Sequence, residues 1–70
     1  MGKFNYYRIK RPQKTDKDEE VIIFENLIDD IQAVQILVRN QIIDLVILHP
    51  FQKFYYSIPD NYLGEKLIVL

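Results

Sequence analysis

The sequence predicts an α+β fold, in which a small antiparallel or mixed sheet is covered on one face by a single helix. Three observations predict this class. Residues 3–11 alternate and are rich in aromatic side chains, residues 29–41 combine a capping signal with a helical apolar stripe, and residues 42–49 form a nearly continuous apolar run. The predicted order is β-β-α-β-β-β within one domain, residues 1–70, because 70 residues hold one core at most.

The first two strands are predicted from aromatic and β-branched residues. Residues 3–11, KFNYYRIKR, alternate as a strand does, and Pro12 ends the strand because proline has no N–H to donate to a ladder. Residues 12–20, PQKTDKDEE, are polar and are predicted to be the mobile connection of a long hairpin. Residues 21–25, VIIFE, are predicted as the second strand.

A helix is predicted over residues 29–41. Asp29 or Asp30 can cap it, and Gln32 follows three residues after Asp29, as in a capping box. Apolar residues recur at helical spacing on one stripe, which consists of Leu27, Ile31, Val34, Val38 and Ile42. Ile36 lies on the opposite side of this helix and is predicted to point away from the stripe. The many β-branched residues weaken helix propensity and leave a strand as the alternative.

Three further strands are predicted after this helix. Residues 42–49, IIDLVILH, are predicted to form a central strand buried on both faces. Residues 53–58, KFYYSI, form an aromatic strand, and residues 59–61 form a turn. Gly64 marks another turn, and residues 66–70, KLIVL, are predicted as the last strand.

A single helix leaves one face of the sheet uncovered, and that face is predicted to carry exposed aromatic rings. The candidates are Tyr6, Tyr7, Phe54, Tyr55, Tyr56 and Tyr62. Exposed aromatic patches mark interaction sites, and large aromatic side chains dominate interface energetics. The predicted partner-binding residues are Tyr6, Tyr55 and Tyr56 as anchors, with Arg8, Lys10 and Arg11 steering the partner. The alternative is that half of these rings complete the core.

Charge is distributed unevenly although the formal net charge is only -1. Residues 1–17 carry six Lys or Arg residues and one Asp, whereas residues 18–30 carry six acidic residues and no basic one. Pairing of the first two strands brings these segments side by side, so neutralisation across the hairpin is the favoured interpretation. A basic patch for a charged partner is the alternative.

The sequence contains no motif typical of catalysis or metal binding. The absence of cysteine and the single histidine exclude cysteine nucleophiles, disulfides and two-histidine metal sites. His49, Ser57 and Thr15 have no catalytic motif around them, and the pair Asp29 and Asp30 fits the first turn of a helix better than a cation site. We therefore predict no enzymatic activity, no cofactor and no metal.

The sequence also predicts a cytoplasmic protein that does not enter a membrane. The N-terminus lacks the apolar core of a signal peptide. The apolar run of residues 42–49 is interrupted by Asp44 and is far shorter than the roughly 20 residues of a membrane span.

Residues 43–50, IDLVILHP, resemble a segment of strand and proline in the epsilon subunit of RNA polymerase from low-GC Gram-positive bacteria. In that family a helix precedes this strand, and an aromatic strand (here FYYSI) and an apolar last strand (here KLIVL) follow the proline. The resemblance implies a non-catalytic accessory subunit docked on the polymerase. The family fold is similar to that of a small phage-encoded polymerase inhibitor, so the resemblance also allows a phage protein.

The function predicted from the sequence is therefore a small non-catalytic protein-binding module, with an accessory subunit of bacterial RNA polymerase as the leading version. The alternative is a phage or mobile-element protein that binds and inhibits a host enzyme. A second alternative is single-stranded nucleic-acid binding through an aromatic and basic sheet face, which the rings and cations of residues 3–11 favour and the negative net charge opposes. Self-association through residues 66–70, as an unprotected edge strand, is a further expectation.

Overall fold

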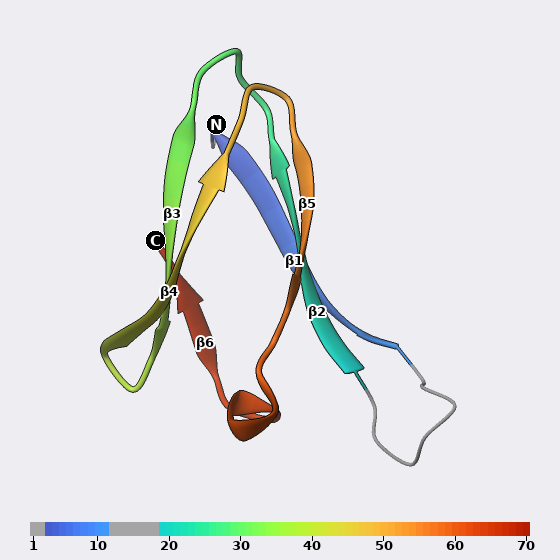
Figure 1. Cartoon of the computed structure of the whole chain (residues 1–70), viewed down its shortest axis with the longest axis vertical. Coiled ribbons are helices and arrows are strands. Elements are labelled where there is room, and N and C mark those ends of the chain that lie inside the picture. The colour runs from blue at the N-terminus through green and yellow to red at the C-terminus, as the bar shows by residue number, and fades with distance from the viewer. Residues whose placement is uncertain (1–2, 12–18) are drawn as a thin grey trace.

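The chain forms two three-stranded antiparallel sheets that face each other (Figure 1). The structure is a computed structural model that describes residues 3–11 and 19–70. Its strands are β1 (Phe4–Arg11), β2 (Glu19–Asn26), β3 (Gln32–Val38), β4 (Gln41–Leu48), β5 (Lys53–Ser57) and β6 (Leu67–Val69). One 3-10 turn, η1 (Asp60–Tyr62), precedes β6, and these residues contain no α-helix.

The two sheets have different strand orders. Sheet A has the order β1-β2-β5, and sheet B has the order β4-β3-β6. The chain therefore crosses from sheet A to sheet B after β2, returns after β4, and crosses again after β5. Every sheet has one face toward the other sheet and one outer face, so the architecture is a small β-sandwich.

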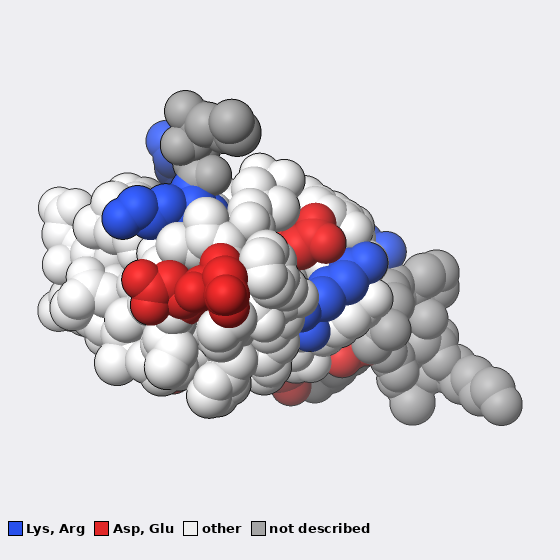
Figure 2. All heavy atoms as spheres, turned by 90° about the horizontal axis from the view of Figure 1, so that it is seen from above, with Lys and Arg blue, Asp and Glu red and all other residues white. Residues whose placement is uncertain are grey.

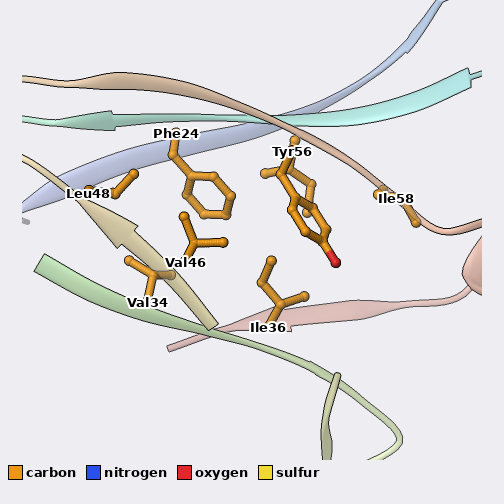
Figure 3. Close-up of a cluster of buried hydrophobic side chains, with 8 residues drawn as sticks. Phe24, Val34, Ile36, Val46, Leu48, Tyr56 and Ile58 are labelled. Atoms are coloured by element: carbon orange, nitrogen blue, oxygen red, sulfur yellow. The ribbon is translucent and has the colours of Figure 1, made fainter. Parts of the chain in front are cut away.

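The core lies between the sheets and is built by alternate residues of four strands (Figure 3). Its buried members are Ile22, Phe24, Tyr56 and Ile58 from the side of sheet A, and Val34, Ile36, Val46 and Leu48 from sheet B. Because successive strand residues point to opposite faces, the residues between these positions lie on the outer faces of the two sheets.

The predicted helix over residues 29–41 is wrong, and with it the α+β class and the order β-β-α-β-β-β. The segment instead forms β3, a turn at residues 39–40 and the start of β4. Val34 and Val38 are four residues apart, a spacing that fits one helical stripe and also two repeats of a strand. Ile36, which lies between them, distinguishes the two structures. A helix would place it on the opposite side from Val34 and Val38, whereas in β3 it points to the same side and is fully buried.

The prediction that residues 42–49 form a central strand buried on both faces is also wrong. They belong to β4, which is an edge strand of sheet B and, among the described strands, pairs with β3 alone. Its inward residues Val46 and Leu48 are buried, while Leu45 and Ile47 are exposed on the outer face. The long apolar run therefore correctly predicted a strand, but the predicted central position of that strand in the sheet was wrong.

The hairpin between β3 and β4 depends on two local features. Its loop consists of Arg39 and Asn40, both with positive φ, as the type I′ turn of a two-residue hairpin requires. The register shifts after Ile36, which leaves Ile43 as an extra residue in β4. In a regular strand, two residues three positions apart point to opposite faces. The bulge removes this offset, so Ile42 and Leu45 both lie on the outer face.

The remaining predicted strands are confirmed. Residues 3–11 form β1, and residues 21–25 lie in β2, to which β1 pairs antiparallel as a hairpin. Residues 53–58 and 66–70 contain β5 and β6. Of the predicted mobile connection, Glu19 and Glu20 belong to β2, and the rest lies outside the described residues.

The crossing connections are tied together by the buried side chain of Asn26 at the end of β2. Its amide nitrogen donates to the carbonyl oxygens of Asp30, at 2.7 Å, and His49, at 2.9 Å. Its amide oxygen accepts the N–H of Ile28 at 3.2 Å. One side chain thus joins the chain that leaves sheet A to the chain that returns to it.

Candidate protein-binding surfaces

The outer face of sheet A carries two exposed tyrosines on either side of a buried isoleucine. The register places Tyr7, Ile23 and Tyr55 in one row across β1, β2 and β5. Tyr7 and Tyr55 are 51% and 54% exposed, whereas Ile23 is 5% exposed. We name this surface, with the neighbouring Ile9 and Val21, the aromatic face. Its rings stand on a sheet backbone, so little conformational entropy is lost when a partner binds them.

The rim of the aromatic face carries charges of both signs. The ammonium group of Lys53 lies 6.0 Å from the centre of the Tyr55 ring, and Lys53 is the register partner of Glu25. Glu19, at the other end of β2, accepts a hydrogen bond from the hydroxyl of Ser57 at 3.1 Å. An apolar, aromatic centre with a mixed polar rim is the composition of interfaces between separately folded proteins.

The outer face of sheet B is a second apolar surface of different composition. We name it the aliphatic face, and it consists of Ala33, Gln35, Leu37, Ile42, Leu45, Ile47, Ile68 and Leu70. None of these eight side chains is charged. Five of them are exposed large aliphatic residues, and the described chain brings no segment over them. Sequence reasoning missed this surface because it assigned its β3 residues to a helix.

The predicted anchors Tyr6 and Tyr56 do not join Tyr55 on the aromatic face. Tyr56 packs between the sheets in the core, so its predicted role as a partner anchor is wrong (Figure 3). Tyr6 is exposed but sits on the inward side of β1, where its ring centre lies 6.2 Å from that of Phe24. The structure instead brings Tyr7 and Ile23 to Tyr55, as alternation along β1 and β2 allows.

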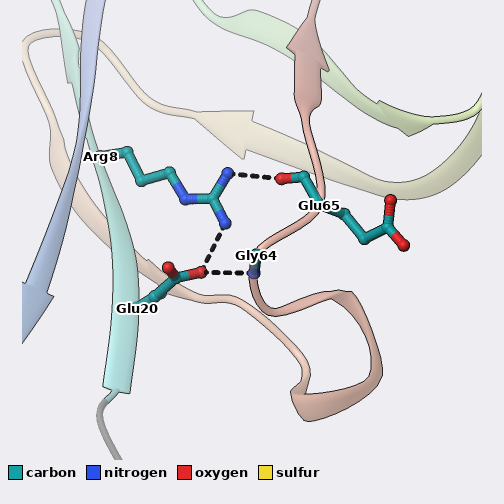
Figure 4. Close-up of polar contacts among 4 residues, drawn as sticks. All are labelled: Arg8, Glu20, Gly64 and Glu65. Atoms are coloured by element: carbon teal, nitrogen blue, oxygen red, sulfur yellow. Dashed lines mark hydrogen bonds and ion pairs between the residues drawn. The ribbon is translucent and has the colours of Figure 1, made fainter.

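Of the basic residues predicted to steer a partner, Arg8 is paired within the hairpin. Arg8 donates to the carboxylate of Glu20 and, at 2.7 Å, to the carbonyl oxygen of Glu65 (Figure 4). Lys10 is the register partner of Glu20, and Arg11 is the register partner of Glu19. The ion pair between Arg8 and Glu20 confirms neutralisation across the hairpin at Arg8. Seen from one end, charged residues form a few separate groups rather than a continuous basic patch (Figure 2).

Glu20 joins the first hairpin to the turn before β6. Its buried carboxylate accepts from Arg8 and, at 3.3 Å, from the N–H of Gly64 (Figure 4). The hydrogen bond from Arg8 lowers the pKa of Glu20 below its usual 4.5, against the opposing effect of burial. Gly64 has a φ of +78°, so the turn that presents this N–H uses a backbone conformation that suits glycine.

The lowered pKa of Glu20 predicts a stabilising contribution that depends on pH. A carboxyl group whose pKa is lower in the folded chain stabilises it above the unfolded value and stops doing so as pH falls through the folded value. Replacing Glu20 by glutamine is expected to lower the free energy of unfolding by about 1–2 kcal/mol at neutral pH. Denaturant unfolding of both proteins should show this difference shrinking below pH 4.5.

The exposed Glu25 on the same strand provides the control for this prediction. Glu25→Gln is expected to change the free energy of unfolding by less than about 0.5 kcal/mol, because exposed charges contribute little. A difference between wild type and Glu20→Gln that is independent of pH from neutral to strongly acidic conditions would contradict the assigned role of the Glu20 carboxylate.

Burial and, to a smaller extent, a hydrogen bond to Asp44 together raise the pKa of the Tyr56 phenol from 10.0 to about 12. Asp44 lies on the inward side of β4, opposite Ile36. The phenol therefore links sheet A to sheet B through a polar contact at the border of the core. Because the folded pKa is raised, this contact stabilises the fold below pH 10 and is lost as pH rises toward 12.

An alkaline titration followed by tyrosinate absorbance should therefore contain one step near pH 12. The Tyr56→Phe variant is expected to lack this step, because it has no phenol between the sheets. Tyr55→Phe is expected to keep it, since the Tyr55 ring is exposed. Persistence of the late step in Tyr56→Phe would contradict the assignment.

The described residues contain no cluster of three or more His, Asp or Glu side chains that could hold a metal ion. No helix in this part of the chain is long and apolar enough to cross a membrane. Comparison with protein-family models, with curated proteins and with solved structures finds no match for this chain. The two outer faces of the sandwich are therefore the features on which an inference about function rests.

Proposed function

We propose that this chain is a small non-catalytic protein-binding module that holds a partner protein on its aromatic face. The observation that carries the proposal is the row of Tyr7, Ile23 and Tyr55, in which two half-exposed rings flank a buried aliphatic floor. Tyrosine is enriched among the residues that dominate binding energy, and such residues act from rigid, well-packed positions. The mixed charges of the rim favour a partner that also exists on its own.

RNA polymerase is the first partner to test. The resemblance that suggests it concerns the strand residues of 43–50, 54–58 and 66–70. The helix that precedes the first of these in the polymerase subunit family has no counterpart here, because β3 occupies that place. Support for this partner is therefore confined to the sequence of three strands. An inhibitor that binds the same or another host enzyme uses the same surface and is distinguished by a transcription assay.

Single-stranded nucleic acid suits the aromatic face less well than protein does. Base stacking requires rings beside cations that follow the phosphate backbone. On the outer face of sheet A, Lys53 is next to Glu25, while Arg8 lies on the inward side and is bound to Glu20. Arg8 thus lies on the opposite side of the sheet from Tyr7 and Tyr55, and its charge is already paired with Glu20.

The test is an affinity pull-down from bacterial lysate, with nuclease added and with washes at low and high salt. The wild type is expected to retain one partner protein through the high-salt wash, because apolar contacts depend weakly on salt. Tyr55→Ser is expected to weaken binding at least about tenfold, the effect of losing one anchor residue. The matched control is Leu45→Ser on the aliphatic face, because Leu45 is 53% exposed and also lies on an edge strand.

Equal binding by the wild type and Tyr55→Ser, with both proteins folded by circular dichroism, would remove the aromatic face from the proposal. Binding that vanishes when nuclease is added would favour the nucleic-acid alternative instead. Recovery of a protein other than RNA polymerase would leave the binding module in place and exclude the polymerase as its partner in that lysate.

A further inference from the structure

The aliphatic face differs from the aromatic face in having no charge and a single strongly polar group. Its outward positions form three rows across sheet B. Ile68, Leu37 and Ile42 form one row, and Leu70, Gln35 and Leu45 form the next. Gln35 thus stands at the centre of the face, on the central strand, with aliphatic side chains on either side.

We propose that a second copy of this chain covers the aliphatic face, stacked sheet on sheet about a two-fold axis that passes beside Gln35. In a two-fold dimer the same surface is used by both chains, so each group must be complementary to itself or to a neighbour. A primary amide meets this condition, because it carries both donors and acceptors and two amides pair reciprocally. A lysine or glutamate at this position would face its own like charge.

The composition of the aliphatic face also favours a second copy over a different partner. Interfaces of permanent homodimers resemble a domain core cut in half, and are more apolar than interfaces between proteins that exist separately. Apart from Ala33 and Gln35, the face contains only leucine and isoleucine, as the core between the two sheets contains mostly aliphatic residues. Stacking at about 10 Å, the usual distance between packed sheets, would bring two such faces into contact.

The size of the face sets the expected strength of association. It spans three strands, and the five residues from Ala33 to Leu37 run along its centre. Strand spacing and rise give about 15 by 17 Å in plan. This plan counts the backbone alone, and the five large side chains that project from it are 40–64% exposed. Two such faces with their rims therefore bury about 1,000 Å² in total, near the lower limit for specific interfaces, so a dissociation constant in the micromolar range is expected.

Stacking of faces is favoured over pairing of edges because the free edge of β4 is partly capped. The backbone N–H and C=O of Gln35 both bond to Leu70 on β6, so Gln35 forms no backbone hydrogen bond with Leu45, which lies opposite it on β4. The N–H of Leu45 therefore points away from β3, to the free edge of the sheet. That N–H is taken by the Asp44 carboxylate at 2.8 Å. The N–H of His49, further along, is taken by the side chain of Gln52 at 2.8 Å. An inward-pointing charge on an edge strand also discourages pairing with another chain.

The described residues leave the aliphatic face open. In each chain the aliphatic face lies on sheet B and the aromatic face lies on sheet A. In a dimer joined through the two aliphatic faces, the two aromatic faces would therefore point outward on opposite sides. The module would then hold two partner molecules at once. The dimer itself does not depend on the proposed function, since it uses a different surface.

The test is sedimentation velocity of the 70-residue chain across about a hundredfold concentration range centred on the micromolar region. The wild type is expected to pass from monomer to dimer. Gln35→Glu and Gln35→Lys are each expected to weaken association about a hundredfold, because each places like charges opposite one another at the axis. An equimolar mixture of the two variants is expected to form a dimer again, because a glutamate in one chain then faces a lysine in the other. Such a recovery requires residue 35 of one chain to lie close to residue 35 of the other.

A neutral pair of variants provides the control. Leu45→Ser is expected to weaken the dimer at least about tenfold, because each substitution acts on both halves of a two-fold interface. Tyr55→Ser, at nearly equal exposure on the aromatic face, is expected to leave the dimer unchanged. A wild type that stays monomeric throughout overturns the proposal. A dimer that is unaffected by Leu45→Ser, or a mixture of charge variants that stays monomeric, overturns it as well.

Loss of the dimer and loss of the partner are separate results. If the wild type is monomeric and still captures a partner through Tyr55, the proposed dimer is overturned and the proposed function is not. A dimer that captures no partner leaves this inference intact and contradicts the proposed function.

Discussion

Replacement of Phe24 by alanine is expected to bring the fold to the margin of stability at room temperature. Phe24 is completely buried, and it is among the largest side chains of the core. Its ring lies 6.5 Å from that of Phe4 and 6.2 Å from that of Tyr6, centre to centre. The cavity and the lost contacts cost about 3–5 kcal/mol. A domain of this length has a total stability of about 4–10 kcal/mol, so the variant falls to the margin of folding.

Denaturant unfolding followed by circular dichroism measures this effect. The control is Phe51→Ala, in which the same atoms are removed from a loop side chain that is 64% exposed. That variant is expected to lose less than about 1 kcal/mol, as surface substitutions usually do. Similar losses in the two variants would contradict the placement of the core between the sheets.

Replacement of Asn26 by aspartate is the second large effect expected, although it changes only one polar group. The amide nitrogen of Asn26 donates to the carbonyl oxygens of Asp30 and His49, and a carboxylate oxygen in its place would face both. The side chain is 1% exposed, so the new charge would be buried with the Ile28 N–H as its remaining donor. Loss of about 3–5 kcal/mol is expected at neutral pH.

The pH dependence of Asn26→Asp distinguishes this mechanism from a general loss of packing. A buried carboxyl group among carbonyl oxygens has a raised pKa, so the folded chain binds a proton more readily than the unfolded chain. The free energy of unfolding should therefore increase as pH falls, since a protonated carboxyl can donate one hydrogen bond. Asn61→Asp, at an exposed position, should not show this recovery. A variant equally unstable at neutral and acid pH would contradict the mechanism.

The strands at both ends of the chain could be predicted because their local signals agree. Residues 3–11 and 21–25 combine alternation with β-branched and aromatic side chains, and the structure forms β1 and β2 there. The predicted pairing of these two strands also placed their opposite charges side by side. The strand of residues 53–58 was predictable for the same reason, with a turn after it that contains Pro59.

The middle of the chain could not be predicted, because its signals allow two structures. Asp29 and Gln32 fit a capping box, yet in the structure the Asp30 carboxylate only accepts the neighbouring Ile31 N–H. The hairpin turn at Arg39 and Asn40 lacks the glycine that usually marks a type I′ turn. With that turn unrecognised, the strand pair on either side of it could be taken for a helix followed by a strand.

The candidate surfaces were predictable only in part, since each depends on which residues share a face. Tyr55 was correctly predicted to be exposed, but its neighbours on the sheet are set by the register of β1 and β2. The aliphatic face requires the bulge at Ile43, which a regular alternation does not reveal. Asn26 is polar at the end of a strand, and only the crossing of the chain between sheets explains why it is buried.

The two faces of the sandwich are proposed to act independently, and residue-resolved NMR spectra test this directly. On dilution from high concentration, signals of the aliphatic face, such as Gln35 and Leu45, are expected to move while those of Tyr7, Ile23 and Tyr55 stay in place. On addition of the partner recovered by pull-down, the opposite pattern is expected. Movement of the same residues in both experiments would contradict the assignment of one face to a partner and the other to a second copy.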